Sequence, residues 1–280
     1  MEKELRLLAE QIRVAALEEF DALGFGHVGG AMSMVEALAV LYGRVMKVDP
    51  KNPKWEERDR LVVSKGHAGP AVYAALAVKG YFPKEMLLTL NKPGTNLPSH
   101  CDANRTPGID MTTGSLGQGM STACGIALGQ QKKKQALHTY LILGDGECNE
   151  GQVWEGAAFA SHYKLSNLIA FVDWNKKQLD GWTEQVLNFG DIAEKFAAFG
   201  WFAQTVNGHD IDRLLDAVAK AKAQTDKPSV IVMDTVKGNG CQFIAEMDAN
   251  HHVAFTKDKM AVALKEARAV LAAAEAAVRE

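Results

Sequence analysis

Long apolar runs, a dominant sign of charge and a leader-like N-terminus are all missing from this sequence. No apolar run approaches the roughly 20 residues that a membrane span needs. Residues 1–20 carry charges throughout and lack the apolar core of a signal peptide. The formal net charge of −3 gives no reason to expect nucleic acid or an anionic membrane as a partner. We therefore expect a cytoplasmic protein that binds neither.

Cysteine is also scarce. The four cysteines form no CxxC pair and no metal-type cluster, so we expect reduced thiols rather than disulfides, a metal site or a cysteine nucleophile. Hydrophobic residues make up 47% of the chain and charged residues 23%, which is the balance of a globular protein rather than a disordered one. Because there is no internal repeat and no low-complexity linker, residues 1–280 are predicted to form a single domain.

The chain does contain an alternation of helical periodicity with short apolar runs. Strands are predicted at 61–63, 139–143, 168–172, 201–206 and 229–236. Helices are predicted at 3–23, 33–45, 68–79, 118–133, 152–163, 191–198, 210–223 and 256–279. Ser33 followed by Glu36 indicates a capping box at the start of the second helix. This alternation predicts an α/β fold, a doubly wound and mostly parallel sheet with helices on both faces.

Polar residues follow the predicted strands at the positions where such sheets bind ligands. Asp145 stands between two glycines directly after one strand, and Asn175 follows the next strand. Neighbouring strand ends can place a carboxylate and an amide oxygen on one Mg²⁺, which takes about six oxygen ligands and often includes phosphate oxygens among them. The spacing therefore predicts a site for magnesium and a phosphorylated ligand.

The order of six motifs is similar to that of the transketolase family. These motifs are GHVGGAMS at 26–33, SKGHA at 64–68, PSH at 98–100, TTGSLGQG at 112–119, GDGECNEG at 144–151 and DWNKKQLDG at 173–181. The resemblance spans most of residues 10–260, whereas a conventional transketolase continues much further. The chain thus resembles the N-terminal, thiamine diphosphate-binding subunit of a split transketolase.

This resemblance implies roles for individual residues at the cofactor. The implied Mg²⁺ ligands are Asp145, Asn175 and the backbone carbonyl of Lys177. Ca²⁺ or Mn²⁺ can take the place of Mg²⁺. The implied contacts to thiamine diphosphate are Gly114, Ser115, Leu116, Gly146, Glu150, Asn175, His67 and His251. Among these, Gly146 would bind the diphosphate through its N–H, Leu116 would lie under the bent cofactor, and Glu150 would link cofactor sites across a subunit interface.

Four histidines of the motifs are implied to be catalytic, namely His27, His67, His100 and His251. His67 and His251 would lie near the diphosphate and the reaction centre, and His27 and His100 would meet oxygens of the donor sugar. His252 directly follows His251, and the sequence leaves open which of the two faces the cofactor. The histidines that match no motif are predicted to be structural: His138, His162 and His209.

The chain departs from the family's usual pattern at two places. Ser115 stands where many members have proline, so the backbone of this loop is less restricted in φ. Lys176 and Lys177 replace a small and an aliphatic residue after Asn175. A backbone carbonyl ligand survives this change. The added positive charge could pair with diphosphate or point to solvent, and we expect both lysine side chains to point to solvent.

The resemblance also implies a partner, because the glutamate that activates the cofactor belongs to a pyrimidine-binding domain that this chain lacks. We expect a C-terminal transketolase subunit, an α2β2 assembly, and two-carbon ketol transfer between sugar phosphates, in the pentose phosphate pathway or in specialised sugar catabolism. Two alternatives stay open. One is an α-type subunit of another thiamine diphosphate enzyme, either 2-oxo-acid dehydrogenase or decarboxylating synthase, and the other is a non-catalytic scaffold subunit.

Overall fold

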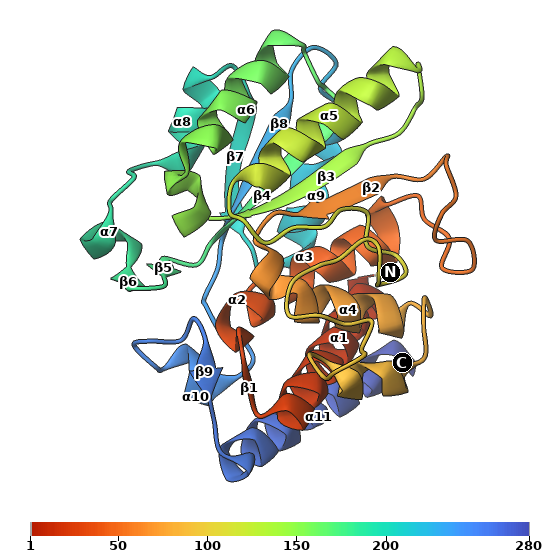
Figure 1. Cartoon of the computed structure of the whole chain (residues 1–280), viewed down its shortest axis with the longest axis vertical. Helices are drawn as coiled ribbons and strands as arrows, with labels where there is room; N and C mark the ends of the chain where they lie inside the picture. The colour runs from red at the N-terminus through yellow and green to blue at the C-terminus, as the bar shows by residue number, and fades with distance from the viewer. Residues whose placement is uncertain (1, 280) are drawn as a thin grey trace.

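A computed structural model describes residues 2–279, and a parallel sheet of five strands lies at its centre (Figure 1). The strands are β2 (Arg60–Val63), β3 (Thr139–Gly144), β4 (Leu168–Trp174), β7 (Phe202–Asn207) and β8 (Ser229–Asp234). Their order in the sheet is β2-β3-β4-β8-β7, and every neighbouring pair is parallel. The predicted α/β fold is therefore confirmed, and all carboxyl ends meet at one edge of the sheet.

Helices cover both faces of this sheet. On one face pack α5 (Gln118–Lys132), α6 (Gly151–His162) and α8 (Ile192–Ala198), and on the other pack α3 (Val35–Val40), α4 (Gly69–Val78) and α9 (Ile211–Lys222). Along β3, Tyr140 and Ile142 face the second group, whereas Leu141 and Leu143 face the first. Because both sets are apolar, the strand has a continuous apolar run rather than an alternating pattern.

A further layer lies behind the second group of helices. It consists of α1 (Glu2–Leu23) and α11 (Lys257–Arg279), which run side by side (Figure 1). The pair is held by buried apolar side chains and, at the surface, by Arg268 Nη2 2.8 Å from Glu18 Oε1. Within residues 2–279, none of the helices combines the length and the apolar character that crossing a membrane requires.

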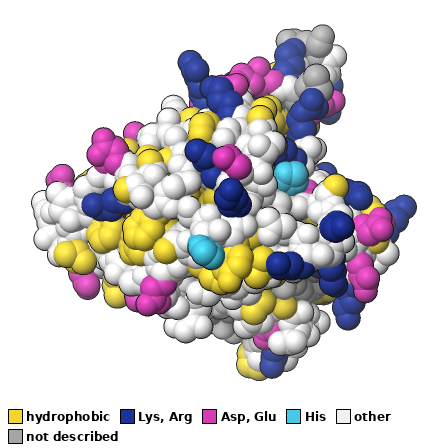
Figure 2. Space-filling model, turned by 90° about the horizontal axis from the view of Figure 1, so that it is seen from above, with side chains coloured by type: hydrophobic (Ala, Val, Ile, Leu, Met, Phe, Trp, Pro, Cys, Tyr) yellow, Lys and Arg dark blue, Asp and Glu magenta, His cyan; other side chains and the backbone are white. Residues whose placement is uncertain are grey.

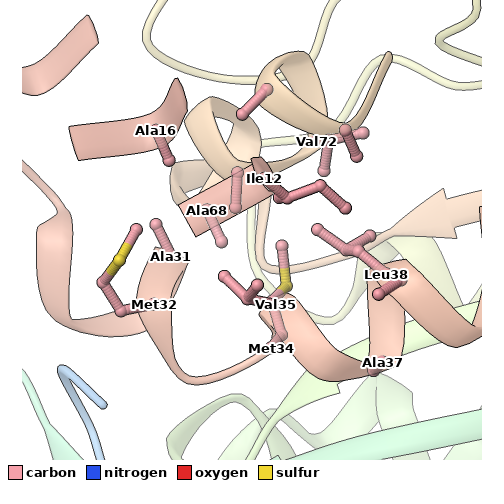
Figure 3. Packing of buried hydrophobic residues seen from close by; sticks show 14 of the residues in the cluster. Ile12, Ala16, Ala31, Met32, Met34, Val35, Ala37, Leu38, Ala68 and Val72 are labelled. Atoms are coloured by element: carbon pink, nitrogen blue, oxygen red, sulfur yellow. The ribbon is translucent and has the colours of Figure 1, made fainter. Parts of the chain in front are cut away.

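The core beneath the segments that carry His27 and His67 is built from small and flexible apolar side chains. Figure 3 shows Ile12 and Ala16 of α1 packed with Ala31, Val35 and Ala68. Ala31 lies in α2 (Val28–Met32) and Ala68 in the 3₁₀ turn η2 (Gly66–Ala68). His27 immediately precedes α2 and His67 lies within η2, so this packing fixes the two histidine-bearing segments relative to each other.

The capping box predicted from Ser33 and Glu36 is wrong. The predicted helix at 33–45 consists of α3 and a π-helical turn, η1 (Leu41–Val45), and a separate short helix, α2, precedes it. Ser33 ends α2, and its hydroxyl donates to Asp173 Oδ2 at 2.6 Å. Glu36 is buried and pairs with the guanidinium of Arg13. Tertiary partners for both side chains outweigh the local capping pattern, which satisfies only exposed backbone groups.

Several short elements were not predicted. They are β1 (Phe25–Gly26), β5 (Lys177–Gln178), β6 (Gly181–Trp182), β9 (Val253–Ala254), α7 (Thr183–Val186), α10 (Gln242–Ala245), η3 (Lys84–Thr89) and η4 (Gly146–Asn149). The antiparallel pair β1–β9 joins the segment before His27 to the segment after His252. Figure 2 shows that, on the face seen from above, hydrophobic side chains alternate with scattered Lys, Arg, Asp and Glu, so one sign of charge does not cover that face.

Candidate active site

A cavity of about 170 Å³ opens at the carboxyl ends of the strands. Its lining consists of Gly30, Lys65, His67, Leu116, Gly144, Asp145, Gly146, Glu147, Asn175, Lys177, Gln178, Leu179, Lys237 and His251. Most of these residues come from the segments that follow β2, β3, β4 and β8, which is where a parallel sheet binds ligands. The structure therefore brings most of the predicted metal and cofactor residues to one place.

Three oxygen donors predicted to bind magnesium lie on this lining. Asp145 Oδ1 accepts the N–H of Gly146 at 2.7 Å, and its Oδ2 accepts the N–H of Lys176 at 2.6 Å. Asn175 donates through Nδ2 to Asp173 Oδ2 at 2.9 Å, which fixes the orientation of its amide oxygen. The Lys177 carbonyl accepts Lys237 Nζ at 2.9 Å. A carboxylate, an amide oxygen and a backbone carbonyl suit a hard cation such as Mg²⁺.

Asp145 is buried, and the surrounding groups do not fully compensate the charge of its carboxylate form. Burial, followed by repulsion from Asp173, raises the pKa of Asp145 to about 7. A divalent cation bound here would reverse this effect because it favours the carboxylate form. Gly146 adds a steric requirement, since a Cβ at this position would lie 2.8 Å from the Cβ of Gln178. The oxygen donors, and the backbone of Gly146 without a side chain, both fit a metal-bound diphosphate.

Asp173 is the buried centre of the site. Its Oδ2 accepts the ammonium of Lys65 and the hydroxyl of Ser33, and its Oδ1 accepts the hydroxyl of Thr235 at 2.5 Å. Lys65 is only 1% exposed. Burial opposes ionisation of Asp173, but Lys65 and the hydroxyl donors outweigh it and lower the pKa of Asp173. Asp173 thus joins four segments and orients Asn175.

The loop of residues 114–119 is held against the sheet by Glu147. Glu147 Oε1 accepts the Ser64 hydroxyl and the Gly117 N–H at 2.7 Å, and Oε2 accepts the Gly144 N–H at 2.9 Å. Leu116, which precedes Gly117, therefore reaches the cavity wall.

The rest of this loop lies toward the surface. Ser115 is exposed, and a Cβ at Gly114 would lie 3.6 Å from His100 Cδ2. Glu150 is also exposed, and its Cβ would be 2.9 Å from a Cβ placed on Gly117. The predicted aminopyrimidine loop and the predicted interface glutamate are thus neighbours.

All four predicted catalytic histidines gather in one cluster. The ring centroid of His27 lies 5.3 Å from that of His67, 5.9 Å from that of His100 and 5.2 Å from that of His251. His67 and His251 are 4.7 Å apart. His252 lies 4.7 Å from His27 but does not line the cavity, whereas His251 does. His251 is therefore the member of this pair that faces the cavity.

The family model described as "Transketolase, thiamine diphosphate binding domain" matches residues 5–272. The chain belongs to the transketolase family. It is 52% identical over 263 residues to the 6-deoxy-6-sulfo-D-fructose transketolase subunit SqwG of Clostridium sp. (strain MSTE9), covering 94% of this chain and 96% of the relative. It is 34% identical to an apulose-4-phosphate transketolase subunit of Phocaeicola vulgatus, covering 94% and 93%.

Solved transketolase structures share this fold. The transketolase of Campylobacter jejuni superposes with a TM-score of 0.88 at 28% identity, covering 98% of this chain and 46% of that protein. A Pichia stipitis transketolase complex with fructose 6-phosphate gives a TM-score of 0.86 at 29% identity, covering 97% and 44%. The present transketolase chain thus spans less than half the length of these solved proteins.

The prediction that both lysines after Asn175 point to solvent is wrong for Lys177, whereas Lys176 is partly exposed. Lys177 is 7% exposed, and its Nζ donates to the Met247 carbonyl at 2.9 Å while lying 4.5 Å from the ring centroid of Trp182. Lys176 pairs with the carboxylate of Asp234. The hairpin of β5 and β6, which the sequence did not reveal, supplies the aromatic surface that covers Lys177.

The three other histidines of this transketolase chain lie outside the cluster. His209 places Nδ1 3.1 Å from Glu36 Oε2 and accepts the Val236 N–H through Nε2 at 2.9 Å. The ring of His138 stacks on Tyr140. His162 lies edge-on to Tyr163. Their contacts are those of structural residues.

Sequence reasoning missed several residues that line or organise the site. They are Lys65, Glu147, Asp173, Gln178, Leu179 and Lys237. Lys65 and Lys237 lie in polar segments that follow predicted strands. The local sequence does not show where the ammonium group of such a long side chain lies. Leu179, which is 63% exposed, lies in a hairpin of two-residue strands with no periodicity to detect.

The four predicted catalytic histidines are held neutral by their surroundings. Burial, followed by neighbouring cationic groups, lowers the pKa of His27 to about 4 and that of His251 to about 3. Burial and Lys65 hold the pKa of His67 well below its usual value, and burial lowers that of His100. Near neutral pH these four imidazoles are therefore uncharged.

This arrangement predicts acid sensitivity of the folded chain. Between about pH 4 and the usual histidine pKa of 6.5, the unfolded chain binds protons that the folded His27 and His251 do not. The free energy of unfolding should therefore fall as pH falls through this window. Urea denaturation at several pH values measures it. The double variant His27→Asn, His251→Asn should show a shallower fall, and an equal fall in both proteins would contradict the assignment.

Proposed function

We propose that this chain is the thiamine diphosphate- and Mg²⁺-binding subunit of a split transketolase, which transfers a two-carbon ketol unit from a ketose to an aldose. The observation that carries this proposal is a single cavity lined both by the donors Asp145, Asn175 and Lys177 and by the catalytic candidates His67 and His251. Family membership supports it. We also propose that residues 1–280 form one cytoplasmic domain.

Asp145, Asn175 and the Lys177 carbonyl would hold the metal, with Mg²⁺ as the first choice and Ca²⁺ or Mn²⁺ as substitutes. The remaining positions of its octahedron suit diphosphate oxygens and water. Gly146 would donate its N–H to the diphosphate. When bound, thiamine diphosphate supplies the carbon nucleophile that transketolase chemistry requires.

The chain's own residues would orient the reactants and move protons. The loop bearing Gly114, Ser115 and Leu116 would contact the aminopyrimidine. His27 and His100 would meet hydroxyl groups of the donor sugar, and a neutral imidazole there can accept a hydroxyl proton. His67 and His251 would stabilise negative charge that develops on oxygen by hydrogen bonding at the cavity wall.

The partner would be a C-terminal transketolase subunit with a pyrimidine-binding domain, in an α2β2 assembly. Support comes from relatives of almost the same length whose names describe them as subunits, and from full-length transketolases of which this chain matches less than half. The exposed Glu150 and the 114–119 loop form the surface that we assign to it.

The two alternative functions have less support. The relatives and solved structures described above are transketolases or transketolase subunits, which disfavours a 2-oxo-acid dehydrogenase or decarboxylating synthase subunit. A non-catalytic scaffold has no need for the complete donor set and histidine cluster. For the donor substrate, 6-deoxy-6-sulfo-D-fructose is the first compound to test because a relative 52% identical carries that name, and fructose 6-phosphate is the natural comparison.

The metal assignment predicts a selective loss of cofactor binding. In Asp145→Ala, the diphosphate charges lose their bridging cation, so calorimetry with thiamine diphosphate and Mg²⁺ on the complex should detect no binding. Asp234→Asn is the matched control, since Asp234 ends the neighbouring strand β8 and its carboxylate pairs with Lys176 rather than with a proposed ligand. It should bind as the wild type does. Unchanged affinity in Asp145→Ala would remove this residue from the site.

The histidine assignment predicts graded losses of turnover in the reconstituted complex. His67→Ala and His27→Ala should each lower the rate of ketol transfer by about two to four decades, the scale of a lost acid–base group. His138→Ala, which changes a half-buried histidine outside the cluster, should have little effect. The chain without its partner should be inactive. Robust transfer by the isolated chain would overturn the split-subunit proposal, and equal losses in all three variants would overturn the catalytic assignments.

A further inference from the structure

The carbonyl oxygen of Lys177, one of the proposed metal ligands, already has a cationic partner. Lys237 Nζ donates to it at 2.9 Å and lies 3.3 Å from Nδ1 of His251. Lys237 follows β8 and is only 4% exposed, whereas Lys177 begins β5. The ammonium group of Lys237, which is distant in the sequence, is therefore hydrogen-bonded to a predicted metal ligand, the Lys177 carbonyl.

The path of this side chain is built into the fold. A Cβ at Gly29 would lie 3.0 Å from Cγ and 3.4 Å from Cε of Lys237, so the aliphatic stem passes directly over this glycine. The N–H of Gly238 donates to the Gly29 carbonyl at 3.0 Å, and Asn250 Nδ2 donates to the Lys237 carbonyl at 3.3 Å. Side-chain and backbone contacts on both sides of Lys237 thus direct its ammonium to the Lys177 carbonyl.

Other lysines at the site are engaged elsewhere. Lys65 is paired with Asp173, Lys176 is paired with Asp234, and the ammonium of Lys177 itself is bonded to the Met247 carbonyl. Among the interactions described for residues 2–279, Lys237 is thus the lysine whose ammonium is bonded to a proposed metal-ligand oxygen. A metal ion on that oxygen would come close to a second cation, and the two would repel each other strongly in a buried site.

We propose that Lys237 is an internal counter-cation that binds the Lys177 carbonyl and competes with the divalent metal for it. The inference rests on the proposed function of this site. Its consequence is that the metal alone binds weakly, whereas metal and diphosphate bind together, because the diphosphate charges compensate both cations. Lys237 thereby couples metal binding to cofactor binding and opposes binding of the metal by itself.

Electron paramagnetic resonance of Mn²⁺ tests this directly, because it measures free metal without requiring activity. The purified full chain is titrated with Mn²⁺ alone. Lys237→Met removes the competing charge, so Mn²⁺ should bind about ten-fold more tightly than to the wild type. Lys237→Arg keeps a cation and should bind weakly like the wild type. Lys176→Met, which removes a neighbouring lysine paired with Asp234, should leave Mn²⁺ affinity unchanged.

Two further arms locate the effect and separate it from the proposed function. In Lys237→Met, Asp145→Ala the gain in Mn²⁺ affinity should disappear, whereas a retained gain would place the metal elsewhere and overturn the proposal. If Lys237→Met folds poorly, Lys237→Gln provides the same test. Equal Mn²⁺ affinity in wild type and Lys237→Met would overturn the proposed role of Lys237 but not the proposed function. Absence of thiamine diphosphate binding by the wild-type complex would instead contradict the proposed function.

Discussion

The geometry of the site depends on the buried ion pair between Lys65 and Asp173. A charge removed from water is costly unless a partner and hydrogen bonds compensate it, and here each group compensates the other. The remaining lone pairs of Asp173 accept Ser33, Thr235 and Asn175, which belong to three separate segments. Losing either charge would leave the other buried and unpaired, so these segments are held in one arrangement before any ligand arrives.

The parts of the fold that could be predicted are those whose signal is local and periodic. The apolar runs of β3 and β4 are buried on both faces of the sheet. They predict the parallel sheet correctly and place Asp145 and Asn175 at the ends of neighbouring strands. The histidine cluster could be predicted only through motifs. Which of His251 and His252 faces the cavity depends on the β1–β9 ribbon, whose two-residue strands are too short to show a pattern.

The wrong predictions share a physical cause, which is that long-range partners outweighed local preference. Ser33 and Glu36 form a capping pattern in the sequence, but Asp173 and Arg13 bind their side chains in the folded chain. The sequence predicts a surface lysine at Lys177, yet the Met247 carbonyl and the face of Trp182 cover its side chain. Buried polar groups of this kind are specified by the whole fold, so a single sequence does not reveal them.

The central claim is that the Lys65–Asp173 pair organises the thiamine diphosphate site. A double-mutant cycle with Lys65→Met and Asp173→Asn, read out as the affinity of the complex for thiamine diphosphate with Mg²⁺, tests it most directly. Each single change leaves a buried charge unpaired, whereas the double change removes both charges. The account predicts a coupling free energy of about 2 kcal/mol, with the double variant binding better than the sum of the single losses. Losses that add within about 0.5 kcal/mol would contradict it.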